Sequence, residues 1–219
     1  MKHGFTLAEV LIAIAIIGVV SAITMPVLIN KYQEKVTVSK VKKIYSTINQ
    51  AILLSIKDNG YPYEWNVDDN RSETSAKQLA SYITPYVKIL KDCNVQTGCF
   101  KYDDVFLLSG NKHDVNYETN RTYYKFILND GSYIFMRSSI GKYCEYTDIG
   151  VSTCGLIGFD INGPKKPNTI GRDIFVTNIT NLGQLKSADI NDYCINKGAY
   201  SGFGCLGYIL QNNNMNYLK

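Results

Sequence analysis

Hydrophobic residues dominate the first thirty positions of the chain, and their spacing then changes. An uncharged run of 20 residues extends from Val10 to Ile29, directly after one acid, Glu9. At a rise of about 1.5 Å per residue, a helix of that length spans roughly 30 Å, the thickness of the hydrocarbon core of a bilayer. The pattern predicts a polar leader at residues 1–4 and a transmembrane helix over residues 5–29.

Beyond the span, apolar residues recur at every third or fourth position. This stripe consists of Val38, Val41, Ile44, Tyr45, Ile48, Ile52 and Ile56. The period predicts an amphipathic stem helix over residues 30–58, continuous with the span, and Asn59-Gly60 is a C-terminal stop signal. Gly18 and Pro26 are the predicted weak points of the long helix, where it bends or loses its helical structure most easily, because proline lacks the N–H that a helix uses.

A second, shorter helix is predicted after the polar residues 61–74. Ser75 and Gln78 have the spacing of a capping box, and apolar residues continue at helical spacing as far as Leu90. Pro85 predicts a kink or a split within this helix.

The rest of the globular head, assigned to residues 59–219, has patterns typical of strands. Residues 122–128 and 132–136 flank Asn129-Asp130-Gly131, which predicts an antiparallel hairpin. Further strands are predicted at residues 105–108, 156–161 and 173–180, and loops from residue 189 onward, with residues 211–219 poorly ordered. The prediction is an α+β fold in which the stem helix packs on one face of a mainly antiparallel sheet.

Composition limits the functions that the head can carry. The net charge is only +4, and the 23 Lys and Arg residues are spread along the chain, which argues against nucleic acid as a partner. The sequence contains no G-x-S-x-G, P-loop or H-E-x-x-H motif, and His113 stands alone in a polar stretch. We therefore predict that the chain is not an enzyme.

The six cysteines fall into three local pairs. The pairs are Cys93 with Cys99, Cys144 with Cys154, and Cys194 with Cys205. None of them forms a C-x-x-C motif and the chain has only two histidines, so a zinc site is not predicted. An even number of cysteines in an exported domain predicts disulfides, and sequential pairing is one of several connectivities. The alternative is six reduced cysteines in a cytosolic domain.

The stretch Gly4-Phe5-Thr6-Leu7-Ala8-Glu9-Val10-Leu11-Ile12 resembles the leader and helix start of the type IV pilin and type II secretion pseudopilin superfamily. The resemblance implies that a prepilin peptidase cuts after Gly4 and that the new N-terminal residue, Phe5, is methylated. A carboxylate in a lipid-embedded helix costs about 2.5–3.5 kcal/mol, so Glu9 is expected to have a partner. The expected partner is the amine of Phe5 in a neighbouring subunit. The alternative is a plain single-pass anchor whose Glu9 reaches the lipid headgroups.

This resemblance implies a structural subunit of a type IV pilus or a type II secretion pseudopilus, with other pilin-like subunits as partners. It also implies a single-pass protein in the lipid of the bacterial inner membrane, with its head outside the cytoplasm. The lysines after the span, counted alone, favour the opposite orientation, but the leader motif and the cysteines favour an exported head. Two other functions stay open, a competence-type pilin that binds DNA and a membrane-anchored exported protein of unrelated function.

One oxygen-rich stretch of the head has two interpretations. Asp160, Asn162, Asn168 and Asp173 lie close in sequence, and such oxygens are the ligands that Ca²⁺ prefers. The stretch is not an EF-hand, because its twelfth position is Gly171, which has no carboxylate. The alternative is a rigid turn, in which the Asp and Asn side chains accept hydrogen bonds from nearby backbone N–H groups.

Overall fold

A computed structural model of the chain describes residues 4, 6–101, 104–139, 144, 147–148, 151–196 and 198–218. The chain divides into two units, Met1–Thr37 and Val38–Lys219. Helix α1 (Leu7–Asn59) belongs to both, since it continues without a break from the first unit into the second.

The first unit consists mainly of the apolar part of α1. The helix is long and apolar enough to cross a membrane, and the protein buries none of its most apolar stretch. It remains helical through Gly18 and Pro26. Near the proline, the Thr24 hydroxyl donates a hydrogen bond to the Val20 carbonyl oxygen at 2.9 Å.

In the second unit, the stem part of α1 buries the predicted stripe. Ile44, Ile48 and Ile52 are each at most 2% exposed. Burying one such side chain stabilises the fold by about 1.5–3 kcal/mol relative to leaving it in water. The helix ends at Asn59, and Gly60 follows with φ +79°, the left-handed conformation that the stop signal predicts.

The second helix begins earlier and ends sooner than predicted. Helix α2 is Glu73–Ile83, and its N-cap is Ser72, whose hydroxyl accepts a hydrogen bond from the Ser75 backbone N–H. The predicted cap at Ser75 is therefore wrong by one turn. The helix gives way to a short 3₁₀ turn, Thr84–Tyr86, where Pro85 stops it, and the residues up to Leu90 do not continue as helix.

Among the described residues the sheet contains seven strands, and every pair of neighbours is antiparallel. They are β1 (Ile89–Asn94), β2 (Tyr124–Leu128), β3 (Tyr133–Ser138), β4 (Thr147–Asp148), β5 (Val151–Asp160), β6 (Ile174–Thr180) and β7 (Leu185–Lys186). The order is β1-β2-β3-β5-β6-β7, with β4 paired to β5. The predicted α+β class and the β2–β3 hairpin are confirmed. Residues 105–108 do not form the predicted strand, because only Phe106 makes isolated bridges, to Lys112 and Thr169.

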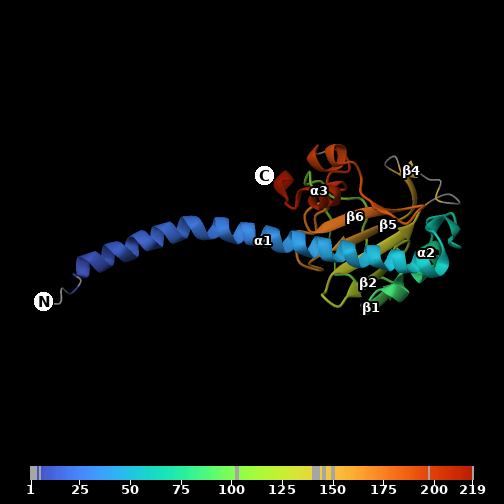
Figure 1. Cartoon of the computed structure of the whole chain (residues 1–219), viewed down its shortest axis with the longest axis horizontal. Coiled ribbons are helices and arrows are strands. Elements are labelled where there is room, and N and C mark those ends of the chain that lie inside the picture. Colours follow the sequence, from blue (N-terminus) through green and yellow to red (C-terminus); the bar gives the residue numbers. More distant parts are fainter. Residues whose placement is uncertain are drawn as a thin grey trace. The chain divides into compact units, whose positions relative to one another are not determined.

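The two faces of the sheet bury different sets of residues. One face packs against the stem of α1 and against α2, and its core includes Phe126, Ile134, Met136, Ile157, Phe159, Phe175 and Ile179. Figure 1 shows the stem crossing the sheet. The opposite face is covered by segments between the strands, and its core includes Tyr117, Tyr123, Phe135, Leu156, Ile174 and Val176. Alternate residues of each strand thus serve two separate cores.

The C-terminal tail is helical, where loops were predicted. A short π-helix, Asn191–Ile195, precedes α3 (Cys205–Asn212) and a 3₁₀ turn, Asn216–Leu218. Leu206 and Ile209 of α3 join the core on the stem side. The Tyr217 hydroxyl donates a hydrogen bond to the Gly171 carbonyl oxygen at 2.7 Å, so the end of the chain is docked on the head.

The close approach of Phe135 to its cross-strand partner Gly158 predicts a stability effect. A Cβ at Gly158 would lie 2.1 Å from the Phe135 ring. We expect Gly158→Ala to lower the free energy of unfolding by about 1–3 kcal/mol, since the ring must leave its position. In thermal melts of the full chain in detergent, Gly198→Ala is the control, because a Cβ there meets nothing closer than 3.9 Å. Equal melting temperatures for the two variants would contradict the packing argument.

Candidate functional site

The N-terminal end of α1 has a hydrogen-bonded cap that includes the predicted assembly residue. Thr6 directly precedes the helix, and its backbone N–H and its hydroxyl both donate to Glu9 Oε2, each at 2.8 Å. The Glu9 N–H donates in return to the Thr6 hydroxyl at 3.3 Å. This reciprocal arrangement is a capping box, so within one chain Glu9 satisfies donors at the start of its own helix. Sequence analysis missed this role, although the Thr-x-x-Glu spacing signals it.

The predicted cleavage site lies only partly within the described residues. Gly4 is described and exposed. Phe5 and residues 1–3 lie outside the described part of the chain, so the structure does not test the predicted cut or the methylation.

The surface of α1 that follows the cap is almost entirely apolar and exposed. The exposed fractions of its large side chains range from 43% at Val10 to 78% at Leu7, and these side chains point outward on all sides of the helix. A helix that is hydrophobic all round is stable only when lipid or other protein covers it. The arrangement therefore fits a membrane anchor and a helix that packs among copies of itself.

Comparisons with known proteins agree with this arrangement. Residues 1–25 match the prokaryotic N-terminal methylation motif, which supports a type IV pilin-like or pseudopilin-like protein. Residues 27–180, more than half of the chain, match a family of unknown function, DUF6613. The chain belongs to this family. No curated protein and no solved structure matches it.

Three disulfides cross-link the head, two of them within the residues that match DUF6613. They join Cys93 to Cys99, Cys144 to Cys154, and Cys194 to Cys205. Each cysteine is thus paired with its neighbour in sequence. Because α3 begins at Cys205, the last of these disulfides connects that helix to the preceding π-helix.

The oxygen-rich stretch of this DUF6613 chain forms a tight turn between β5 and β6. Asp160 Oδ1 accepts hydrogen bonds from the N–H groups of Asn162 and Gly163, at 2.9 and 3.0 Å. Asp173 accepts from the N–H groups of Asn168 and Thr169, at 2.8 and 2.6 Å. Burial raises the pKa of Asp173, and these two hydrogen bonds act in the opposite direction. The contacts are those of the rigid-turn alternative.

This turn also anchors two distant segments. Phe106 donates its N–H to the Asn168 carbonyl oxygen at 2.9 Å, and Ile170 donates to the Phe106 carbonyl oxygen at 2.8 Å. On the other side, Gly171 and Gly202 approach so closely that a Cβ on Gly171 would lie 2.8 Å from the Gly202 Cα. The turn therefore connects the segment before β2 and the C-terminal tail to the sheet.

The calcium alternative concerns the same four residues. The Oδ1 atoms of Asn162 and Asn168 are buried and have no hydrogen-bond partner among the described residues. These amide oxygens and the two carboxylates are chemically suited to a hard cation. Both oxygens of Asp173, however, already accept backbone hydrogen bonds. Within the described residues, no cluster of three or more Asp, Glu, His or Cys side chains could hold a metal ion.

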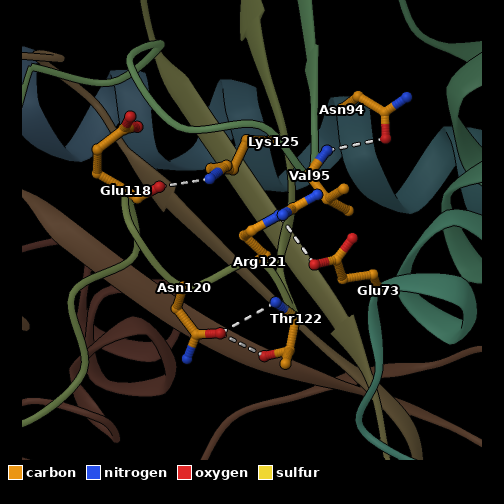
Figure 2. A network of polar contacts seen from close by, with 8 residues as sticks. All are labelled: Glu73, Asn94, Val95, Glu118, Asn120, Arg121, Thr122 and Lys125. Atoms are coloured by element: carbon orange, nitrogen blue, oxygen red, sulfur yellow. Dashed lines mark hydrogen bonds and ion pairs between the residues drawn. The ribbon is translucent and has the colours of Figure 1, made fainter.

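A second polar cluster, which includes Glu118 and Lys125, contacts the Cys93–Cys99 loop, and Figure 2 shows the contact between Glu118 and Lys125. The Glu118 carboxylate accepts hydrogen bonds from the N–H groups of residues 98–100, and the Glu118 carbonyl oxygen accepts one from the Lys125 ammonium. Burial lowers the pKa of Lys125, while the charge of Glu118 acts in the opposite direction. These hydrogen bonds give the pair a structural role in fixing the loop.

The hydrogen bonds at Asp173 predict how the turn responds to mutation and to calcium. Asp173→Asn replaces an acceptor oxygen by a donor that faces backbone N–H groups, and we expect it to lower the free energy of unfolding by about 1–3 kcal/mol. The exposed Asp69→Asn is the control. We expect the wild-type melting temperature to be the same in excess calcium and in excess EDTA. A calcium-dependent rise that Asp173→Asn abolishes would show instead that the turn is a cation site.

Proposed function

We propose that this chain is a structural subunit of a type IV pilus or a type II secretion pseudopilus. In this proposal, a prepilin peptidase cuts after Gly4, Phe5 becomes the methylated N-terminus, and α1 packs among the same helices of other subunits. The observation that carries the proposal is the combination of the methylation-motif match at residues 1–25 with an apolar, exposed helix directly behind it.

The physical argument for assembly rests on Glu9. A lone carboxylate at the lipid-embedded end of a helix is costly, and its capping contacts to Thr6 come from neutral donors. The positively charged amine of a neighbouring Phe5 would supply the opposite charge. Pairing of this kind sets the axial register between neighbouring helices, since only one offset brings the two groups together.

The proposed location is the bacterial inner membrane, with residues 5–29 as the single span and the head outside the cytoplasm. Three disulfides in the head support an oxidising compartment. Among the described residues, the first buried side chain of α1 is Val38, so the apolar span and the buried stem do not overlap. Residues 30–37 would then form the stretch of helix that leaves the membrane.

Processing predicts a defined mass for the mature protein. We expect intact-mass analysis of the protein from its native membrane to show the loss of residues 1–4 and a gain of about 14 Da, the mass added by one methyl group. A mature protein that retains Met1–Gly4 would contradict the proposed processing.

If Glu9 pairs with the amine of a neighbouring subunit, filament assembly should depend on the negative charge of Glu9 more than on its hydrogen bonds in the helix cap. Glu9→Gln keeps an acceptor oxygen for Thr6 but removes the charge, whereas Glu9→Val removes both. We expect both variants to be processed and to lose filament assembly, as measured by the yield of sheared filaments. Glu34→Gln, which neutralises a carboxylate elsewhere on α1, is the control and should assemble normally. Normal assembly of Glu9→Gln would show that only the cap is needed.

A further inference from the structure

A pocket of about 340 Å³ lies on the sheet face opposite the stem helix. Its floor is a row of three residues on adjacent strands. Arg137 of β3 pairs with Leu156 of β5, and Leu156 pairs with Asn178 of β6. Because directly paired residues point to the same face of a sheet, the guanidinium group and the carboxamide flank an apolar centre.

Aromatic side chains form the walls of this pocket. Tyr117 and Tyr123 stand on one side, and their rings meet edge to face with centroids 5.3 Å apart. The C-terminal tail supplies Tyr193 and Phe203, which lie beside the Cys194–Cys205 disulfide in sequence. Gly202 and Gly204 donate their N–H groups to the Tyr193 carbonyl oxygen, so the tail side of the pocket is also fixed. Disulfide and hydrogen bonds thus preform the walls.

The charged groups that line the pocket are positive. Among the lining residues that the structure describes are the two arginines Arg71 and Arg137, and no carboxylate. The Arg137 guanidinium lies 5.2 Å from the centre of the Tyr123 ring, which holds it against the wall. Burial is the main cause that lowers the pKa of His113. The charge of Asp114 raises this pKa, and the charge of Arg137 lowers it. The imidazole is therefore mostly neutral at pH 7, and the positive charge comes from the guanidinium groups.

We propose that this pocket binds a small organic anion that carries a ring, with its acidic group at Arg137 and its ring against the tyrosines. A guanidinium group binds a carboxylate with two parallel hydrogen bonds, and aromatic walls stack on the face of a sugar or an aromatic ring. The volume lies at the lower end of the range for small-molecule sites, which limits the ligand to one or two rings. The site lies wholly within the second unit and does not depend on filament assembly.

The test uses the full chain in detergent micelles and measures binding by calorimetry. The probes are glucuronate and benzoate, each with a neutral counterpart, glucose and benzyl alcohol. We expect at least one acid to bind, and its neutral counterpart to bind roughly tenfold more weakly or not at all. Preference for glucuronate identifies a sugar acid and preference for benzoate an aromatic acid, and both results support the proposal. Binding of neither acid, or equal binding of acid and neutral counterpart, would overturn it.

Variants locate the binding to the pocket. Arg137→Gln should weaken binding of the acid by roughly tenfold or more. Arg172→Gln removes the same charge from an exposed position outside the pocket and should leave binding unchanged. Melting temperatures show whether each variant is folded. If Arg137→Gln is not folded, Arg137→Lys replaces it, because lysine keeps a positive charge but cannot form the two parallel hydrogen bonds of a guanidinium group. Unchanged binding in a folded Arg137→Gln or Arg137→Lys variant would place the anion elsewhere.

Discussion

Burial of one stripe of α1 against the antiparallel sheet is the interaction on which the rest of the head depends. The stripe begins at Val38 and supplies a continuous row of apolar side chains to the core on that face. A sheet of this kind needs cover on its apolar face, and here the stem of α1 provides it together with α2 and α3. Because side chains alternate along a strand, commitment of residues such as Ile157 and Ile179 to the stem directs their neighbours to the other face.

Among the described residues no long helix covers the opposite face, and irregular segments take that role. Such segments gain little from local structure, so other interactions must fix them. The Cys93–Cys99 loop is fixed by its disulfide and by the Glu118 carboxylate, and the tail by the Cys194–Cys205 disulfide. The turn closed by Asp173 connects the segment around Phe106 and the tail to the sheet. Hydrogen bonds between specific polar groups thus fix the covering segments on this face, whereas burial of the apolar stripe of α1 fixes the cover on the other.

Strong local periodicity explains which elements the sequence predicts. The long helix, the hairpin around Gly131 and strands β5 and β6 follow from it, because the pattern there lies within a few neighbouring residues. Strand β1 does not, since Ile89–Asn94 is mostly exposed and becomes a strand by pairing with β2. The sequence around helix α3 is rich in glycine and asparagine and does not predict a helix. The burial of Leu206 and Ile209 in the core stabilises it. The pocket depends on the register of three strands and on two distant segments, and no local pattern encodes that.

The two units of the chain expose different kinds of surface, an apolar helix in the first and a folded head with a pocket in the second. The apolar helix in Leu7–Thr37 has no cover of its own, so its stability in water is low and its need for lipid or other helices is permanent. The head beyond Val38 has complete cores on both faces of its sheet. The proposed assembly uses the first unit, whereas the proposed pocket lies in the second. A substitution in the pocket therefore leaves the exposed apolar surface of the first unit unaltered, and the head keeps its fold provided that the stripe on α1 and the turn at Asp173 are kept.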